Sequence, residues 1–305
     1  MKIEVSNLTK NFGDKEVLRD ISFAAESGKA IGLLGRNGAG KTTTIRIIMG
    51  VFYQDSGSVT MDGKPFDRNR VRIGYLPEER GLYPKKKIKE QLIYFGMLRG
   101  LSKNDAAKAT VKWLERMGMS EYAEKKLETL SKGNQQKIQL AVTLLCDPQL
   151  IILDEPFSGL DPVNAMLLKD VIKEMIAGGA AVIFSSHQMN YIEEFCDDIV
   201  ILNGGKIVLD GAITAIKRSY PRNNIEISSV QYKSIAPFVI QQLGDIIEST
   251  DTDDRNSLVR VKLKKPEYKD KLFSAVFEKG FDIDCFKVCE PALNDIFVEY
   301  TEGGI

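Results

Sequence analysis

Short apolar runs alternate with longer amphipathic stretches from the start of the chain to about residue 218. Clear strand patterns cover residues 30–34, 72–76, 150–153 and 181–184, and the last two are continuous apolar runs. A continuous run is typical of a central strand that is covered on both faces, whereas a half-exposed strand alternates. The order of elements therefore predicts an α/β domain with a largely parallel sheet.

Strand patterns disappear between residues 87 and 146, where amphipathic helical stretches follow one another. This change predicts a helical subdomain inserted into the α/β domain. Trp113 lies in one of these stretches, and its simplest role there is packing, because a large apolar ring on such a helix is usually buried.

A polar break with a proline, residues 219–224, separates two textures of sequence and predicts a domain boundary. We expect a first domain over 1–218 and a second over 223–305. The second domain has the pattern of an α+β, ferredoxin-like β-α-β-β-α-β unit. Its expected elements are a strand at 225–228, a helix at 234–243, strands at 245–248 and 257–263, a helix at 267–279, a strand at 281–288 and a last helix at 292–301 that packs back onto one of the domains.

The acidic run at residues 251–254 lies between two expected strands of this second domain. It lacks the glycine and the downstream glutamate of a calcium-binding loop, so it is interpreted as a solvated hairpin turn.

Composition narrows the classes of function. The chain has 305 residues, 43% of them hydrophobic, and its 42 Lys and Arg balance 42 Asp and Glu, so no overall basic field favours nucleic acid. No window approaches the roughly 18 uninterrupted apolar residues of a membrane-spanning helix, and the N-terminus lacks the apolar stretch of a signal peptide. We therefore expect a cytoplasmic chain with no nucleic-acid partner.

The four cysteines, Cys146, Cys196, Cys285 and Cys289, lie in apolar stretches of sequence. We expect reduced, buried thiols. A zinc site is not expected, because the single histidine, His187, lies far from the closely spaced pair Cys285 and Cys289.

A glycine-rich segment directly after the first strand pattern carries the strongest chemical signal. It matches G-x-x-x-x-G-K-[ST] and comprises Gly35, Arg36, Asn37, Gly38, Ala39, Gly40, Lys41, Thr42 and Thr43. In such a phosphate-binding loop, backbone N–H groups and the N-terminus of the following helix face an anion. The lysine reaches the terminal phosphates and the first threonine ligates Mg²⁺. These residues predict an ATP-binding site.

Two carboxylates, Asp154 and Glu155, end the apolar strand pattern at 150–153. A charged pair in this position is commonly a helix cap, but ligands of an α/β sheet also bind at the strand ends. Together with the phosphate-binding loop, the pair predicts a partner site for the nucleotide. Asp154 would hold Mg²⁺, and Glu155 would accept a proton from, or orient, the water that attacks the γ-phosphate.

A further segment follows Leu130 at the start of an expected helix. It comprises Ser131, Lys132, Gly133 and Asn134. It resembles the L-S-G-G-Q signature of ATP-binding cassette (ABC) proteins, although Lys132 replaces a glycine and Asn134 replaces the glutamine. Ser-x-Gly before a helix is also an ordinary N-cap. The run Ser158-Gly159-Leu160-Asp161 and His187 stand in the order and spacing of the same family. The resemblance implies that Asp161 belongs to a loop across a dimer interface and that His187 contacts the γ-phosphate as a catalytic residue, with Glu155 and Lys41.

Phe12 and Glu78 complete the resemblance. Phe12 stands where the family stacks an aromatic ring on adenine, although an aromatic near an N-terminal strand usually packs inward. Glu78 replaces the glutamine of the family's switch loop. The resemblance implies that Glu78 lies near the metal, where its carboxylate adds a negative charge near MgATP. Its effect is therefore either weaker nucleotide binding or tighter metal binding.

The resemblance implies how the chain works with partners. Two cassettes face head to tail and bury two ATP molecules, each between the phosphate-binding loop of one chain and the signature segment of the other. A separate multi-spanning permease carries the transport path, so the chain is expected at the inner face of the cell membrane. We expect the helical subdomain to dock this permease. The lysines Lys85, Lys86, Lys87 and Lys89 would then lie near the membrane, or else form a solvated helix start.

Residues 223–305 resemble the tail of ATPases from bacterial exporters, including the sodium-extrusion and the drug or peptide branches. The leading interpretation is therefore the ATPase subunit of an exporter. A soluble ABC ATPase acting on nucleic acid or ribosomes, and a regulatory module that senses ATP without hydrolysing it, remain alternatives. The sequence does not identify the cargo or the role of the second domain.

Overall fold

The computed structural model describes residues 1–79, 81–158 and 160–302, and Gly159 of the expected dimer loop lies outside these residues. The chain folds into two compact units. The first contains Met1–Ile213 and the described residues from Phe297 onward, and the second contains Thr214–Ile296. The boundary expected from the sequence lies a few residues later, and the last helix contributes residues to both units.

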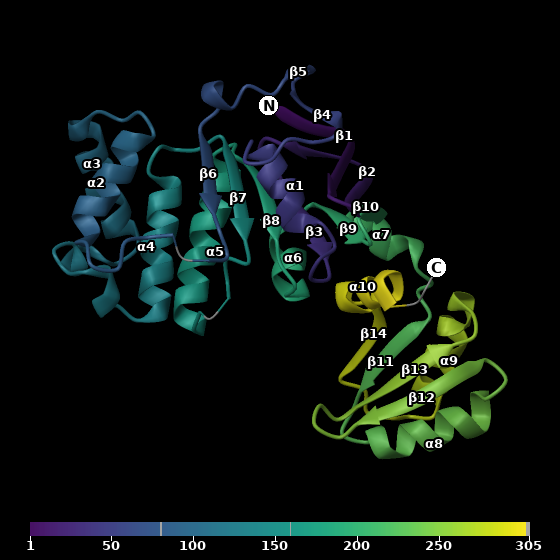
Figure 1. The fold of residues 1–305 in the computed structure, drawn as a ribbon. Coiled ribbons are helices and arrows are strands. Elements are labelled where there is room, and N and C mark those ends of the chain that lie inside the picture. Colours follow the sequence, from purple (N-terminus) through teal and green to yellow (C-terminus); the bar gives the residue numbers. More distant parts are fainter. Residues whose placement is uncertain (80, 159, 303–305) are drawn as a thin grey trace. The chain divides into compact units, whose positions relative to one another are not determined.

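The first unit is built around a six-stranded sheet, drawn in Figure 1, in the order β10-β9-β3-β8-β7-β6. All neighbouring strands are parallel except β9 and β10, which are antiparallel. The strands are β3 (Ala30–Gly35), β6 (Ile73–Leu76), β7 (Leu150–Asp154), β8 (Ala181–Ser185), β9 (Asp198–Asn203) and β10 (Lys206–Ala212). The four strand patterns read from the sequence are confirmed as β3, β6, β7 and β8.

The two faces of this sheet bury different partners. Ile31, Leu33 and Ile152 belong to a core shared with the helix α1 (Lys41–Ile48). On the other face, Ile151 and its neighbours lie against α4 (Lys132–Leu144) and α5 (Pro162–Ala177). Both faces are therefore covered, which explains why β7 and β8 are apolar at every position before their last residue.

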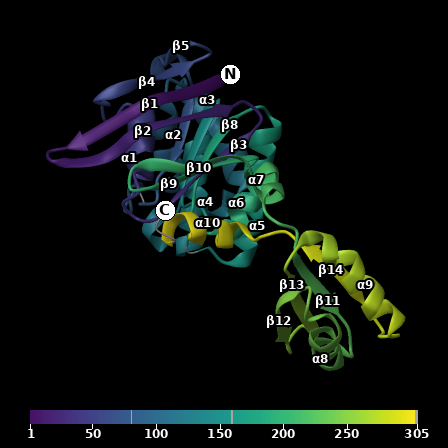
Figure 2. The same ribbon diagram turned by 90° about the vertical axis from the view of Figure 1, so that its right-hand side faces the viewer.

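A second, four-stranded antiparallel sheet has the order β2-β1-β4-β5 and is seen in Figure 2. Its strands are β1 (Lys2–Phe12), β2 (Lys15–Glu26), β4 (Ser56–Met61) and β5 (Lys64–Pro65). Ile3, Val5 and Ile21 from this sheet join the core around α1. The register between β1 and β2 shifts three times, so the alternation of apolar and polar residues is interrupted.

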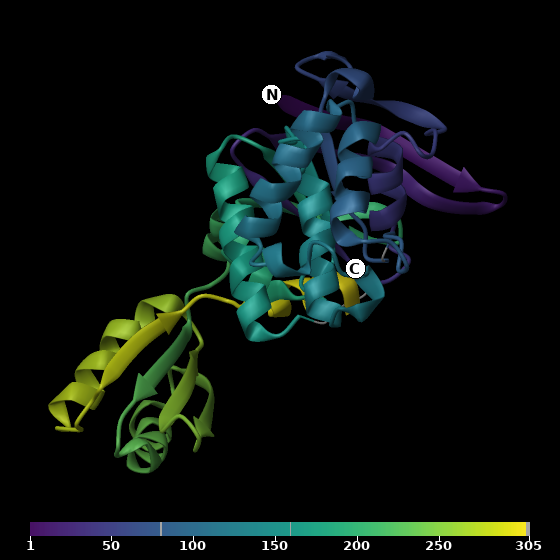
Figure 3. The same ribbon diagram turned by 90° about the vertical axis from the view of Figure 1, so that its left-hand side faces the viewer.

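The expected helical subdomain is present, and its helices are visible in Figure 3. They are α2 (Ile88–Leu98), α3 (Lys103–Arg116) and α4. Trp113 on α3 is 3% exposed, which confirms its packing role. The remaining helices of the first unit are α6 (Met189–Phe195) and single 3-10 turns at Arg68–Arg70, Ser120–Tyr122 and Leu127–Thr129.

The second unit has a four-stranded antiparallel sheet in the order β12-β13-β11-β14. The strands are β11 (Asn224–Ser228), β12 (Ile247–Asp253), β13 (Leu258–Leu263) and β14 (Cys285–Cys289). The helices are α7 (Ile213–Ser219), α8 (Tyr232–Leu243), α9 (Lys269–Glu278) and α10 (Leu293–Glu302), with a 3-10 turn at Pro266–Tyr268. The order of strands and helices from β11 to β14 is the β-α-β-β-α-β order expected from the sequence.

The hairpin turn of this unit differs from the prediction. Residues 251–253 belong to β12, and the turn occupies 254–257. Asp253 explains the shift, because its carboxylate accepts hydrogen bonds from the N–H groups of Arg255 and Asn256 at 3.1 and 3.2 Å. The acidic run thus supplies the end of β12, the residue that closes the turn and the first residue of the turn, Asp254.

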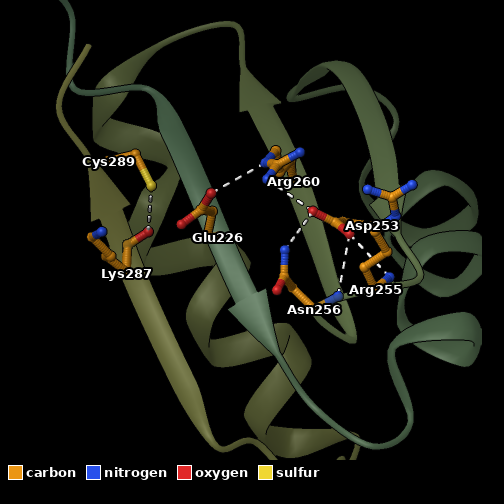
Figure 4. A network of polar contacts seen from close by, with 7 residues as sticks. All are labelled: Glu226, Asp253, Arg255, Asn256, Arg260, Lys287 and Cys289. Carbon is orange, nitrogen blue, oxygen red and sulfur yellow. Dashed lines mark hydrogen bonds and ion pairs between the residues drawn. The ribbon is translucent and has the colours of Figure 1, made fainter. Parts of the chain in front are cut away.

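The uncovered face of the sheet carries a polar network, shown in Figure 4. Arg260 lies between Glu226 and Asp253, with nitrogen–oxygen distances of 3.1 Å to each. Two cysteines on this face correct the expectation of buried thiols, because Cys285 is exposed and Cys289 is only half-buried. Side chains alternate between the two faces along β14, so Cys285 and Cys289, four residues apart, both lie on the open face. Cys146 and Cys196 are buried as expected.

Candidate functional site

The phosphate-binding loop connects β3 to the N-terminus of α1. Gly35 at the start of the loop has φ of +155°, and a Cβ there would lie 2.6 Å from the backbone oxygen of Leu202, so no other residue fits. Helix α1 begins at Lys41, with no side-chain cap and no acidic residue in its first turn. Its free N–H groups are therefore open to an anion.

Lys41 folds back over this loop. Its ammonium donates hydrogen bonds to the backbone oxygens of Gly35 at 2.6 Å and Arg36 at 3.3 Å. Burial holds the pKa of Lys41 below its ordinary value, although nearby carboxylates oppose this effect. A bound phosphate would add negative charge close to this partly buried ammonium and would favour its charged form.

Asp154 lies at the end of β7 and is 5% exposed. Burial raises the pKa of its carboxyl, and the negative charges of Glu78 and Glu155 raise it further. A buried carboxylate among other carboxylates favours a cation, and oxygen donors are the ligands that Mg²⁺ prefers. The Thr42 hydroxyl and the Asp154 carboxylate both line the same pocket, so the residues present fit a magnesium ion.

Glu155 follows Asp154 with φ of +49°, a left-handed conformation that is strained for a residue with a side chain. Glu155 as a whole is 8% exposed, and its carboxylate contacts Ser186 and His187 in the loop between β8 and α6. Oε1 lies 2.8 Å from both the backbone nitrogen and the Nδ1 atom of His187. The structure therefore brings together the two residues expected to act on the γ-phosphate, which come from neighbouring strand ends.

One pocket of about 560 Å³ collects most of the predicted residues. Phe12 is 44% exposed and lines this pocket, which argues against a core role. It packs edge-on against Phe52, with the ring centroids 5.3 Å apart. The predicted residues along the pocket are Phe12, Asn37, Gly38, Gly40, Lys41, Thr42, Thr43, Glu78, Asp154, Glu155 and His187.

Three residues of the loop do not line the pocket. Gly35 and Ala39 are buried, and Arg36 is exposed. The Arg36 guanidinium forms an ion pair of 3.3 Å with Glu302 at the end of α10, within the first unit. The backbone of these residues shapes the loop, whereas their side chains lie away from the cavity.

The signature segment lies at the start of α4, outside the pocket. Ser131 is the N-cap of this helix, and its hydroxyl accepts a hydrogen bond from the backbone N–H of Asn134 at 3.3 Å. Lys132 is exposed and Gly133 is buried. A Cβ at Gly133 would lie 2.7 Å from the side-chain nitrogen of Asn164, so this glycine allows α4 to approach the start of α5.

Asp161 also lies outside the pocket, as the N-cap of α5. Its carboxylate accepts a hydrogen bond from the backbone N–H of Asn164 at 2.9 Å. This bond is the largest cause that holds the pKa of Asp161 below its ordinary value. Neither Asp161 nor Ser131 reaches the pocket of its own chain, so a role at a nucleotide would require a second chain.

Three residues near the site were missed by sequence reasoning. Lys15 and Val17 of β2 line the pocket, and nothing in their local sequence indicates this. Ser186 contacts Glu155, and its only sequence signal is its position next to His187.

Comparison with known proteins agrees with this geometry. Residues 18–158 match the family model described as ABC transporter, and residues 211–301 match the C-terminal domain of ATP-binding protein DrrA1-3-like proteins. The uncharacterized ABC transporter ATP-binding protein YhaQ of Bacillus subtilis (strain 168) is 41% identical over 298 residues, which cover 97% of each chain. The chain belongs to the ATP-binding proteins of ABC transporters.

Further relatives extend this assignment. The Nod factor export ATP-binding protein I of Burkholderia lata is 35% identical over 222 residues, which cover 71% of this chain and 73% of the relative. A solved structure described as the ATP-binding subunit of an ABC transporter has 31% identity and a TM-score of 0.66, and the match covers 72% of this chain and 93% of that one. The α/β cassette fold expected from the sequence is thereby confirmed.

Membership in this family makes the chain a nucleotide-binding ATP hydrolase and the ATP-binding subunit of an ABC transporter. Proteins of the family work as dimers with membrane permease components. Among the described residues, no helix is both long and apolar enough to span a membrane.

Proposed function

We propose that this chain hydrolyses MgATP in the pocket between the phosphate-binding loop and the ends of β7 and β8, and that hydrolysis powers export through a separate membrane permease. The observation that carries the proposal is the convergence of Lys41, Asp154, Glu155 and His187 on one pocket. Export is favoured by the exporter name of the Burkholderia relative and by the C-terminal domain, which matches the DrrA-like family.

Each residue has a role that its environment supports. Lys41 leaves the backbone oxygens that it now contacts and binds the terminal phosphates. Thr42 and Asp154 would hold a magnesium ion, which would neutralise charge on the phosphates. Glu155 orients the attacking water or accepts its proton, and His187 binds the γ-phosphate. Phe12 stacks on the adenine ring, since its exposed ring borders the same pocket.

Changing Glu155 tests the catalytic assignment. In the purified protein, Glu155→Gln should lower steady-state ATP hydrolysis by about 10²-fold or more, because the amide cannot accept a proton. Nucleotide binding, measured by equilibrium titration with a fluorescent ATP analogue, should persist. Hydrolysis near the wild-type rate would exclude Glu155 from this role.

An aromatic pocket of about 360 Å³ on the helical subdomain supports the permease proposal. It is lined by Tyr83, Lys86, Glu90, Gln91 and Tyr94, shortly after Glu78 in the sequence. The Gln91 side chain accepts a hydrogen bond from the backbone N–H of Tyr83 at 3.2 Å, and the Tyr83 ring stacks on Phe95. Such a preformed pocket, with aromatic walls and charged rims, suits a short helix of a partner.

The expected role of the four lysines at the membrane receives limited support. Lys87 and Lys89 both form ion pairs with Glu124, at 3.0 and 3.7 Å. Lys86 lines the aromatic pocket instead. Two of the four charges are thus partly balanced within the subdomain, which favours a structural role for Lys87 and Lys89.

Isolation of the complex tests the partner. The tagged chain, extracted from membranes in mild detergent, should copurify with a multi-spanning protein in a stoichiometric amount. Tyr83→Ala should reduce this recovery several-fold, because aromatic anchors in pockets carry much of an interface's binding energy. Val111→Ala is the matched control, since Val111 is exposed on α3 and does not line the pocket. Recovery with ribosomes and no membrane protein would instead support the soluble ATPase.

A further inference from the structure

Ser186 makes a contact with Glu155 that no sequence motif indicates. It lies in the loop between β8 and α6 and is 1% exposed. Its hydroxyl oxygen is 3.0 Å from Oε2 of Glu155, and it also accepts a hydrogen bond of 3.1 Å from the backbone N–H of Gln188. Since the carboxylate oxygen accepts, the hydroxyl proton of Ser186 is directed at Glu155.

The two oxygens of Glu155 are held by different groups. Oε2 contacts the Ser186 hydroxyl, whereas Oε1 contacts the backbone nitrogen and Nδ1 of His187. The contact of Nδ1 with Oε1 would be broken if the His187 side chain, which is 69% exposed, turned toward a phosphate. Ser186 is buried, and its second bond joins it to the backbone, so its hold on Oε2 does not depend on that movement.

We propose that Ser186 is a positioning residue for Glu155. Its hydroxyl keeps Oε2 fixed at the loop, so that Oε1 is the oxygen that exchanges His187 for the attacking water. This second step rests on the proposed function. The contact between Ser186 and Glu155 itself does not rest on that function, because it is observed directly. A fixed carboxylate is needed because a shift of about 1 Å in a catalytic group can cost up to about 10²-fold in rate.

Steady-state kinetics test the positioning role. Ser186→Ala should lower kcat for ATP about tenfold and leave KM within about twofold, because the lost bond positions a catalytic group and does not bind substrate. Ser186→Thr keeps the hydroxyl and should recover most of the lost kcat. An unchanged or increased kcat in Ser186→Ala would overturn the proposal.

The second unit offers a matched control for the loss of a buried hydroxyl. Ser229 is fully buried, accepts a hydrogen bond from the backbone N–H two residues later, as Ser186 does, and donates to the backbone oxygen of Asp282. Ser229→Ala should leave kcat and KM unchanged. If Ser186→Thr fails to fold, the comparison of Ser186→Ala with Ser229→Ala still decides the result.

A spectroscopic measurement tests the contact without hydrolysis. The chain has one histidine, so selective labelling gives a single Nδ1 resonance in the nucleotide-free protein. Glu155→Ala removes the partner of Nδ1 and defines the unpaired chemical shift. Ser186→Ala should move the resonance toward that value, whereas Ser229→Ala should not. A lower kcat with an unmoved resonance, or a moved resonance with unchanged kcat, would overturn the proposal.

The two proposals fail in different ways. If Glu155→Gln hydrolyses ATP at the wild-type rate, the proposed role of Glu155 is wrong, whatever the resonance of His187 does. If Glu155→Gln is inactive and Ser186→Ala behaves as the wild type in both measurements, only the inference about Ser186 is wrong.

Discussion

Asp154 illustrates how a functional side chain lowers the stability of the cassette. Its carboxylate is nearly fully buried, and burial together with two neighbouring carboxylates raises its pKa. A raised carboxyl pKa means that folding disfavours the charged form, so the ionised group destabilises the nucleotide-free protein at neutral pH. The ionised carboxylate would therefore be stabilised by a cation bound beside it.

Replacement of this carboxylate should stabilise the nucleotide-free protein. At pH 7, Asp154→Asn should raise Tm, by about 2–4 °C for each kcal/mol of burial cost removed. The gain should shrink as the pH falls through the raised pKa, because the wild-type carboxyl then becomes neutral in the folded state. Differential scanning calorimetry over a pH series measures both effects. A lower Tm at pH 7 would contradict this account.

Replacement of Asp154 should also weaken the stabilisation of the protein by MgATP. MgATP should raise the Tm of the wild type, because a ligand that binds only the folded state stabilises it by about 2.7 kcal/mol at 100 times its Kd. Asp154→Asn should lose the part of this increase that depends on magnesium. Titration with ATP in the presence of a chelator provides the control.

Strand β11 is one of the two inner strands of the second unit's sheet, and its residues alternate between the buried and the open face. Ile227 on this strand is fully buried, and its neighbour Ser228 faces the open side of the sheet. Ile227→Ala should destabilise this unit by about 2–5 kcal/mol, as deletion of buried aliphatic groups generally does. Hydrogen exchange of the amides in β11 and β13 measures the loss. Ser228→Ala, one position along the strand, should leave exchange nearly unchanged.

The elements also show which patterns predict structure. The continuous apolar runs of β7 and β8 were predictable because both faces of the sheet are covered. The bounds of β1 and β2 cannot be predicted in this way, because three register shifts interrupt the alternation of apolar and polar residues between them. The hairpin turn was placed too early, because its closing hydrogen bonds come from the Asp253 side chain, and a run of acidic residues alone does not reveal which carboxylate forms them.

The candidate site was predictable to the extent that it depends on local motifs. Lys41 and Thr42 follow from the spacing of one loop, and Asp154 and Glu155 follow from the end of one strand. Ser186, Lys15 and Val17 could not be predicted in the same way. Their places at the site depend on how separate strands come together, and this is a property of the fold.

The signature residues and the pocket belong to different surfaces of one cassette. Ser131 caps α4 outside the pocket that Lys41 lines. If each ATP lies between Lys41 of one chain and Ser131 of another, as the resemblance implies, neither chain alone has a complete site. The activity should then depend on which chain of a dimer carries a substitution.

Mixing of inactive variants tests this arrangement. Lys41→Ala removes the phosphate contact and Ser131→Arg blocks the signature surface, so each variant alone should be inactive. In a dimer of one chain of each kind, both lesions fall on the same site and the other site is intact. Equimolar mixing should restore about a quarter of wild-type turnover, because half of randomly formed dimers pair the two variants and each has one intact site.

A second mixture shows whether restoration requires this geometry. Lys41 and Glu155 line one pocket of the same chain, so a dimer of Lys41→Ala with Glu155→Gln carries one lesion in each of its two sites. This mixture should stay inactive, although it contains the same number of substitutions. Activity in both mixtures would mean that Lys41 and Glu155 of one chain serve different sites. Inactivity in both, with dimers present by light scattering, would mean either that each signature segment serves its own chain or that the two sites must act together.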